Sequence, residues 1–363
     1  MEAKSFNDLL KKSQKKYGEE LIRIGNDNVI SGIEWWELDS PKIADLLGKG
    51  LPKGRMIEVY GEESTGKTSL CYYFSGQVQK QGGNIVYIDT ENAVDPEYAS
   101  QMGLDLEKAL IVQPDYGEQA LDIAIDMIES NQVDLIIIDS VAALVPKAEL
   151  EGEMTDMTIG LMARTNSKFC RKVASILNKA KCSIIFVNQT RDKIGVLYGN
   201  PTTTSGGKAI KFASSIRLQT YKKETLIGSD KRPYGNICRL KTVKNKVACP
   251  YRDTEVTLLY GKGYDVEGEW IDFAVLHNVI QKSGGWFQVP NVEKRIQGLH
   301  NVKAYLEENP EEYEEIKKKV KKLMNRTIHE EDEEIKENAK DEEVEESLEE
   351  INNNKEIKNE ENV

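Results

Sequence analysis

The strongest constraint on the fold is a loop at residues 61–68 that fits the pattern G-x-x-x-x-G-K-[ST]. An apolar, strand-like run precedes it, and residues 69–74 are apolar enough to begin a buried helix. Glycines let a backbone wrap closely around an anion, and the N–H groups of the loop and of the helix start point at phosphates. Lys67 would reach the β- and γ-phosphates, and the Thr68 hydroxyl would bind Mg²⁺. The residues expected to cradle a nucleotide are Gly61, Glu62, Glu63, Ser64, Thr65, Gly66, Lys67, Thr68 and Ser69.

Composition excludes several protein classes. A chain of 363 residues can bury a large core and hold one to three domains. It has no apolar run of membrane-spanning length, and its first residues are polar, unlike a signal peptide. The five cysteines form no C-x-x-C pair, and three histidines make a structural zinc site an unfavourable interpretation. We therefore expect a protein of the reducing cytoplasm.

The negative charge of the chain lies in its C-terminal tail. The net charge is −12, from 61 acidic and 49 basic residues. Residues 327–363 hold 16 of the acidic and 4 of the basic residues, which leaves 45 of each elsewhere. One interpretation is a disordered tail that aids solubility. The other is a tail that competes with DNA phosphates for the protein's own basic surface.

The order of the elements predicts a doubly wound α/β core. Apolar runs alternate with helical stretches between residues 54 and 220, and continuous apolar strands are typical of a parallel sheet covered on both faces. The segments that follow are more β-like, and an amphipathic helix is expected over residues 5–22. The expected core strands are 56–60, 85–89, 110–113, 135–139 and 183–188, and the expected core helices lie near 68–80, 117–130 and 159–180.

Acidic residues end two of the predicted strands. Asp139 follows the apolar run 135–138, where a carboxylate beside a phosphate loop can hold Mg²⁺ through water. Asp89 and Glu91 follow the strand 85–88, at the same sheet edge. Either could position and deprotonate an attacking water, or both could merely cap the next helix. The residues alone leave that choice open.

Two irregular stretches adjoin the predicted site. Gln189 ends a strand, and its amide could contact a γ-phosphate. Residues 190–207, rich in Gly and Thr and without clear periodicity, come directly after it. Loops of this length in a compact domain are usually functional. Residues 151–158 precede a helix on which Arg164, Lys168 and Arg171 share a face, either as a solvated face or as contacts to a phosphate backbone.

Taken together, these blocks resemble the bacterial RecA recombinase family. The resemblance covers roughly residues 45–325 and rests on ordered blocks of sequence rather than on one motif. The blocks are the loop at 61–68 and the segments 88–96, 113–121, 139–149, 188–191, 193–195, 199–201 and 243–246. Three departures stand out: Ser31–Lys53 lacks the usual small-residue pattern, Glu62 replaces a usual Pro, and Thr202 a usual Glu. Such drift suits a phage- or plasmid-carried homologue as well as a chromosomal one.

The resemblance assigns roles to individual residues. It implies that Glu91, rather than Asp89, activates water, that Gln189 senses the γ-phosphate, and that Asp95 and Tyr98 contact adenine. Lys244 and Lys246 match lysines that reach the ATP of a neighbouring subunit. The expected catalytic set is thus Lys67, Glu91, Gln189, Lys244 and Lys246. The expected DNA contacts are Ile159, Arg164, Ser167, Arg171, Arg191, Ile194, Gly206 and Gly207, and the expected subunit contacts are Lys211, Phe212 and Arg217.

The resemblance also implies an organisation and a function. It divides the chain into a polymerisation helix and linker (1–30), an ATPase core (31–263) with DNA-binding loops at 151–159 and 190–207, a small α/β domain (264–326) and an acidic inhibitory tail (327–363). The implied protein is an ATP- and Mg²⁺-dependent, nucleoid-associated recombinase. It would form helical filaments on single-stranded DNA, pair them with duplex DNA and promote self-cleavage of a LexA-type repressor in the DNA-damage (SOS) response. The alternatives from other classes are a purely regulatory scaffold and a hexameric helicase-type motor.

Overall fold

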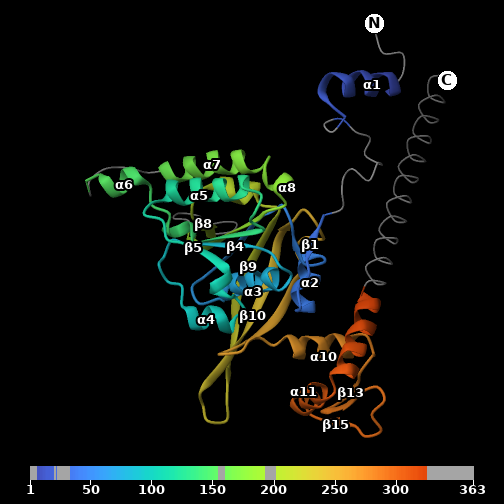
Figure 1. Cartoon of the computed structure of the whole chain (residues 1–363). Helices are drawn as coiled ribbons and strands as arrows, with labels where there is room; N and C mark the ends of the chain where they lie inside the picture. The colour runs from blue at the N-terminus through green and yellow to red at the C-terminus, as the bar shows by residue number, and fades with distance from the viewer. Residues whose placement is uncertain (1–5, 20–21, 23–32, 154–159, 193–201, 325–363) are drawn as a thin grey trace, which may run out of the picture. The chain divides into compact units, whose positions relative to one another are not determined.

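The computed structural model describes residues 6–19, 22, 33–153, 160–192 and 202–324 (Figure 1). The chain divides into two compact units, Met1–Asp265 and Val266–Val363. In the described part of the chain, no helix is long and apolar enough to cross a membrane.

The first unit is built on one sheet, which has ten strands among the described residues. Its parallel part runs in the order β9-β3-β7-β6-β4-β5, and β10, β11 and β12 extend it in antiparallel fashion beyond β9. This confirms the predicted α/β class. Nine strands follow this order: β3 (Met56–Gly61), β4 (Ile85–Asp89), β5 (Ala109–Val112), β6 (Leu135–Asp139), β7 (Ser183–Asp192), β9 (Ile216–Ile227), β10 (Pro233–Asn245), β11 (Asp253–Leu259) and β12 (Gly263–Tyr264). The tenth, β8 (Thr202–Thr204), lies outside this order and pairs with β7.

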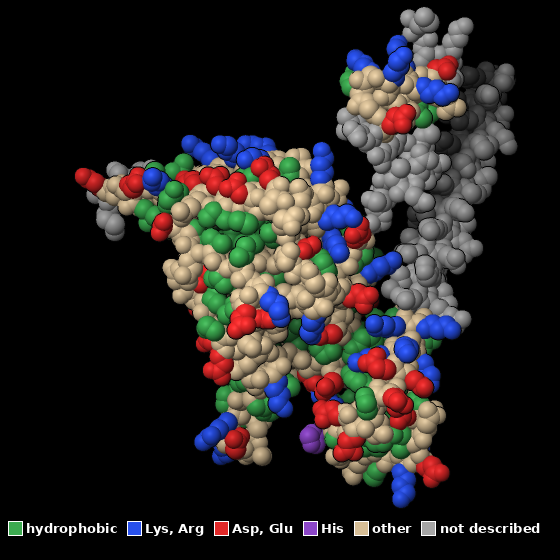
Figure 2. All heavy atoms as spheres, viewed as in Figure 1, with side chains coloured by type: hydrophobic (Ala, Val, Ile, Leu, Met, Phe, Trp, Pro, Cys, Tyr) green, Lys and Arg blue, Asp and Glu red, His purple; other side chains and the backbone are tan. Residues whose placement is uncertain are grey.

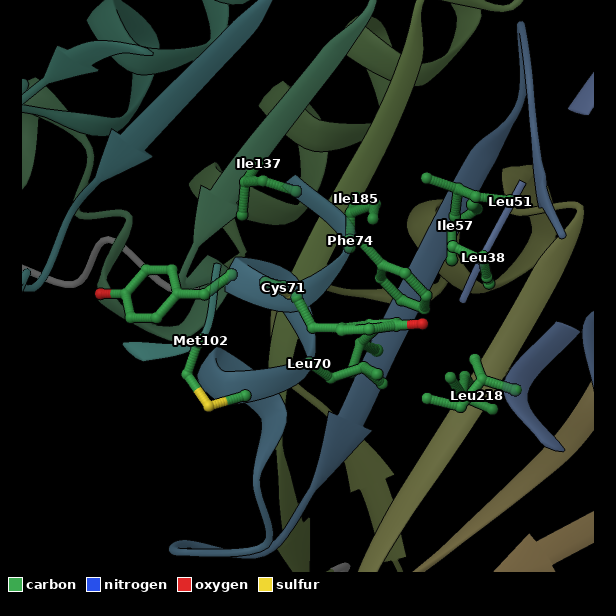
Figure 3. Packing of buried hydrophobic residues seen from close by; sticks show 14 of the residues in the cluster. Leu38, Leu51, Ile57, Leu70, Cys71, Phe74, Met102, Ile137, Ile185 and Leu218 are labelled. Carbon is green, nitrogen blue, oxygen red and sulfur yellow. The ribbon is translucent and has the colours of Figure 1, made fainter. Parts of the chain in front are cut away.

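Alternate residues of the parallel strands face two separate hydrophobic layers. Ile57, Ile137 and Ile185 point to α3 (Lys67–Lys80), where they pack on Leu70 and Phe74 (Figure 3). The opposite set, including Met56, Ile88 and Ile136, packs against α5 (Gly117–Glu129) and α7 (Leu161–Val173). Because both faces are covered, the central strands carry the continuous apolar runs seen in the sequence.

Residues 33–53 form a small substructure that the sequence did not suggest. Strands β1 (Trp35–Trp36) and β2 (Leu51–Pro52) pair around α2 (Pro41–Leu47), whose N-terminus is capped by Ser40. Asp39 accepts hydrogen bonds from Tyr73 Oη (2.6 Å), Gln77 Nε2 (2.7 Å) and Lys80 Nζ (2.9 Å) on α3. These bonds fasten the segment to the helix that follows the phosphate loop.

Other boundaries differ from the sequence-based expectation. The N-terminal helix α1 covers Phe6–Tyr17 rather than 5–22, and the helix expected at 159–180 is split into α7 and α8 (Leu177–Ala180). The stretch 190–207 was expected to be irregular throughout, which is wrong at both ends. Strand β7 continues to Asp192 and pairs in antiparallel fashion with β8 (Thr202–Thr204).

The second unit is a small α/β domain with its own core. Helix α10 (Val266–Leu276) is followed by an antiparallel sheet of β13 (Gln281–Ser283), β14 (Trp286–Gln288) and β15 (Ile296–Gln297), then by α11 (Leu299–Glu308). The chain is helical again over residues 310–324. Trp270, Phe287 and Val302 belong to one buried cluster.

Candidate nucleotide site and nucleic-acid interface

The predicted site residues meet at the carboxyl ends of adjacent parallel strands. Gly61, which ends β3, lies opposite Gln189 of β7, and Asp89 of β4 lies opposite Asp139 of β6. The order β3-β7-β6-β4 therefore places the phosphate loop, the amide and the acidic groups along one edge of the sheet. Ligands of open α/β sheets bind at this edge.

The phosphate loop needs glycine at two positions. Gly66 has φ = 86°, in the left-handed region that favours glycine. A Cβ on Gly61 would overlap the backbone oxygen of Thr220 on β9. Thr65 Oγ1 donates to Glu62 O (2.8 Å) and pairs with Thr220 Oγ1 (2.7 Å), which fixes the curve of the loop. Glycine is therefore needed at Gly61 for close packing against β9 and at Gly66 for the left-handed backbone.

Lys67 begins α3, and its ammonium group folds back over the loop. Lys67 Nζ donates to Glu62 O at 2.5 Å. Partial burial lowers the pKa of Lys67, although the carboxylates of Asp139 and Glu91 act in the opposite direction. A bound triphosphate would supply the negative charge that this half-buried cation lacks.

Asp139 and Thr68 fit a magnesium site. Thr68 Oγ1 donates to Asp139 Oδ2 at 2.8 Å, so the hydroxyl and the carboxylate are already adjacent. Burial raises the pKa of Asp139, and hydrogen bonds from Tyr87 and Thr68 oppose that rise. Oxygen donors of this kind are those that Mg²⁺ prefers. With Mg²⁺ and nucleotide bound, these residues would hold the metal beside the phosphates, where it would neutralise developing charge.

Asp89 and Glu91 differ in burial and in hydrogen-bond partners, a difference that could not be inferred from the sequence. Asp89 is 3% exposed and accepts hydrogen bonds from the N–H groups of Ala93 (3.2 Å) and Val94 (3.1 Å). Its carboxylate therefore holds the turn after β4. Glu91 is exposed, and Glu91 Oε1 accepts a hydrogen bond from Ser140 Oγ at 2.5 Å. This arrangement favours Glu91 as the group that reaches an attacking water.

The strand that carries Gln189 also holds the end of the second loop. Asn188 is fully buried, and its Oδ1 accepts from the N–H groups of Gln189 (2.9 Å) and Ser205 (3.1 Å). Asn188 Nδ2 donates to Ser205 O and to Glu58 Oε1, both at 3.0 Å. The Asn188 side chain therefore links the backbone of Gln189 to that of Ser205.

The predicted adenine contacts lie beside the start of α3. Asp95 caps α4 (Pro96–Gln101) by accepting from the N–H groups of Glu97 and Tyr98, and the Tyr98 hydroxyl is hydrogen-bonded to Ser69 Oγ. The contact with Ser69 brings Tyr98 next to the phosphate loop. Its half-buried ring leaves surface on which a base could stack.

The described part of the predicted DNA surface gathers on α7 and on the end of the second loop. Arg164 and Arg171 are exposed, and Lys and Arg side chains gather over α7 at the top of the view (Figure 2). A Cβ on Gly207 would meet Ala163 Cβ at 2.8 Å, and Asn166 Nδ2 donates to Gly206 O at 3.1 Å. The half-buried Ser167 is on the same helix, and Arg191 is exposed, with its Nε 3.4 Å from Ser205 Oγ. Ile159 and Ile194 lie outside the described residues.

Of the predicted subunit contacts, Arg217 is engaged internally. Lys211 and Phe212 are exposed, Phe212 to 67%. Arg217 is 7% exposed, and its Nε donates to Glu58 Oε2 at 2.5 Å while the guanidinium lies over the Tyr60 ring. Arg217 forms part of the wall of a cavity of about 390 Å³. The other lining residues are Tyr60, Thr190, Thr203, Thr204, Lys211, Phe212, Gln219, Val243, Lys244 and Tyr251.

The two lysines expected to act across a subunit boundary differ in their surroundings. Lys244 Nζ donates to the carbonyls of Lys211 (3.1 Å) and Phe212 (2.8 Å), at the C-terminal end of α9 (Lys208–Ala213). A cation there stabilises the helix end. Partial burial, with Lys246 and Arg217 nearby, lowers the pKa of Lys244. Lys246, by contrast, is exposed.

Sequence reasoning missed Glu58 and Arg217 as a pair. Glu58 is a charged residue within the buried strand Met56–Gly61, and Arg217 is a charged residue within the buried first part of β9. A charge inside a buried strand needs a partner, so this pattern could have predicted the pair. The sequence does not predict that Asn166 and Asn188 hold the end of the second loop. A single asparagine forms no sequence pattern that would reveal its hydrogen-bond partner.

Comparisons with known proteins agree with this geometry. Residues 4–265 match the RecA N-terminal domain family, and residues 268–325 match the RecA C-terminal domain family. The chain is similar to Protein RecA of the Staphylococcus aureus strains JH9, Newman and JH1. Each is 44% identical over 317 residues, which span 87% of this chain and 91% of the relative. The chain belongs to the bacterial RecA family.

Proposed function

We propose that this chain is an ATP-hydrolysing DNA recombinase that forms filaments on single-stranded DNA and exchanges strands with a homologous duplex. Family membership supports a role in DNA recombination and repair, with binding of ATP and DNA. The observation that carries the finer proposal is the placement of Gln189. It lies opposite Gly61 of the phosphate loop, and its neighbour Asn188 holds the end of the second loop.

In this mechanism each residue has one task. The loop at 61–66 and Lys67 hold the triphosphate, and Glu91 orients a water and takes its proton. Gln189 binds the γ-phosphate and transmits its presence along β7 to Ser205. The exposed arginines of α7 bind the sugar–phosphate backbone without reading sequence, so that homology is recognised by base pairing. Promotion of repressor self-cleavage is supported by the resemblance alone.

The first test is ATP hydrolysis with and without single-stranded DNA over a range of protein concentrations. Stimulation by DNA that rises cooperatively with protein concentration is expected, because the active site would be completed by a neighbouring subunit. Turnover that is independent of DNA would contradict the proposal. Electron micrographs would distinguish the helicase-type motor. That alternative is favoured if the protein hydrolyses ATP but forms closed hexamers and no filaments on DNA.

A mixing experiment tests whether a subunit completes its neighbour's site. Lys246→Ala keeps Glu91 and loses the lysine, whereas Glu91→Gln keeps the lysine and loses the base. Each variant alone should be nearly inactive, because charge stabilisation in trans is worth orders of magnitude in rate. In an equal mixture, about one interface in four would combine an intact Glu91 with a neighbour's Lys246 if assembly is random. Recovery of DNA-stimulated hydrolysis to that fraction is expected, and no recovery would place Lys246 in its own subunit's site.

Salt dependence tests the basic face of α7. Arg164→Ala and Arg171→Ala should each weaken binding to oligo(dT) and reduce the slope of log affinity against log salt by about 0.7 for each phosphate that is no longer neutralised. The matched control is Lys80→Ala. Lys80 ends α3, which begins at the site edge of the sheet and runs away from it. Fluorescence anisotropy between about 50 mM and 200 mM salt measures the slopes. Equal slopes for all variants would remove α7 from the interface.

A further inference from the structure

A buried phenol contacts the carboxylate expected to hold Mg²⁺. Tyr87 is 1% exposed and lies on β4, beside β6, which carries Asp139. Tyr87 Oη donates to Asp139 Oδ2 at 2.7 Å, and Thr68 Oγ1 donates to the same oxygen at 2.8 Å. Among the described residues, Asp139 Oδ1 accepts no hydrogen bond, so one carboxylate oxygen is held by two donors and the other is left for a water or a metal.

The protein fixes the position of this phenol. Its ring packs at 5.3 Å, centroid to centroid, from the ring of Tyr72 on α3. Tyr87 also belongs to the buried layer that contains Ile137 and Leu70. A side chain closed in by strands and helix has little freedom to move, so the hydroxyl is presented to Asp139 in one place.

Thr68 alone would orient Asp139 poorly. Its hydroxyl is the group expected to bind the metal, and its own position would therefore change when the metal arrives. Tyr87 reaches the carboxylate from the buried layer of the sheet and would hold it in both states. Groups that orient a metal-binding side chain typically account for about 10–100-fold in metal affinity.

We propose that Tyr87 is a positioning residue for the divalent cation of the nucleotide site, acting through its hydroxyl on Asp139. The inference rests on the proposed function, because it requires that the site binds a metal–nucleotide complex. It assigns Tyr87 no contact with the metal or with the nucleotide. The competing interpretation is that the hydroxyl only satisfies a buried carboxylate and stabilises the core.

The test is nucleotide binding by the full chain as Mg²⁺ is varied. Fluorescent N-methylanthraniloyl-ADP is titrated in EDTA and at increasing Mg²⁺ concentration, with wild type, Tyr87→Phe and Tyr73→Phe. Tyr73 is a matched control, because its phenol also donates to a carboxylate, that of Asp39, at 2.6 Å, outside the site. In Tyr87→Phe, the Mg²⁺ concentration that gives half of the full increase in nucleotide affinity should rise about 10–100-fold. The affinity for the nucleotide in EDTA should stay unchanged. Tyr73→Phe should leave both quantities at the wild-type values.

The outcomes separate the inference from the function on which it rests. If Tyr87→Phe weakens binding equally with and without Mg²⁺, or leaves the Mg²⁺ dependence unchanged, the hydroxyl serves the core alone and the inference is wrong. If the wild type shows no strengthening by Mg²⁺, the proposed function itself fails. Thermal unfolding in EDTA checks that each variant is folded. Tyr87→Met, which fills part of the space of the ring without a hydroxyl, replaces Tyr87→Phe should that variant not fold.

Discussion

Replacement of Glu91 by glutamine is expected to slow ATP hydrolysis by about 10²–10⁴-fold, the range attributed to a positioned general base. Glutamine has nearly the same shape and can still accept the hydrogen bond from Ser140 Oγ, but it cannot take a proton from water at neutral pH. Binding of ATP and of single-stranded DNA should be unchanged, because Glu91 belongs to neither binding surface. Single-turnover hydrolysis with saturating DNA measures the chemical step, and fluorescent-nucleotide titration measures binding.

The matched control for this substitution is Asp89→Asn. Asp89 accepts backbone N–H bonds from Ala93 and Val94, so its loss should lower the stability of the turn after β4. Hydrolysis per folded molecule should fall far less than in Glu91→Gln. Normal turnover in Glu91→Gln, or the larger kinetic defect in Asp89→Asn, would contradict the assignment of the base.

The second large effect is expected from the buried ion pair. Glu58 is fully buried, and Arg217, its partner at 2.5 Å, is 7% exposed. Glu58→Gln leaves the guanidinium buried without a counter-charge, and removing one partner of such a pair costs about 3–5 kcal/mol of unfolding free energy. Urea unfolding followed by tryptophan fluorescence measures the loss.

A paired substitution distinguishes the charge from the shape of the site. In Glu58→Gln with Arg217→Met, no charge remains at either position, and the introduced glutamine can still accept from Asn188 Nδ2 as Glu58 does. Most of the stability lost in Glu58→Gln should therefore return. If the double variant is as unstable as the sum of the two single variants, the cost comes from packing rather than from the unpaired charge.

The sequence predicted the part of the molecule in which local pattern and burial agree. Continuous apolar runs such as Leu135–Asp139 have one use in an α/β protein, so their strands were expected at the residues where they occur. The glycine pattern of the phosphate loop reports a backbone requirement, seen in the positive φ of Gly66. Patterns of this kind can be recognised within one segment, without knowing which distant residues it contacts.

What could not be predicted depends on partners far apart in the chain. Thr202–Thr204 pairs with the end of β7, and a short threonine run gives no register by itself. The hydrogen-bond partners of Asp39 are on α3, so the sequence of residues 33–53 alone could not predict how this segment is anchored. The choice between Asp89 and Glu91 likewise required the neighbours of each carboxylate. The family resemblance implies Glu91, and the hydrogen bonds of the two carboxylates favour the same choice, which stays a prediction.

The two hydrogen bonds of Lys244 have a consequence for how subunits join. Its ammonium already has acceptors, the carbonyls of Lys211 and Phe212, which end the helix that begins directly after Gly207. If Lys244 binds a neighbour's phosphate, as the family resemblance implies, assembly exchanges one set of acceptors for another and does not simply add a contact. The free energy that this contact contributes to assembly is then only the difference between the two sets of hydrogen bonds. A neighbour without ATP would offer too little to draw the lysine away, so the exchange would act as a check on whether the incoming subunit is loaded.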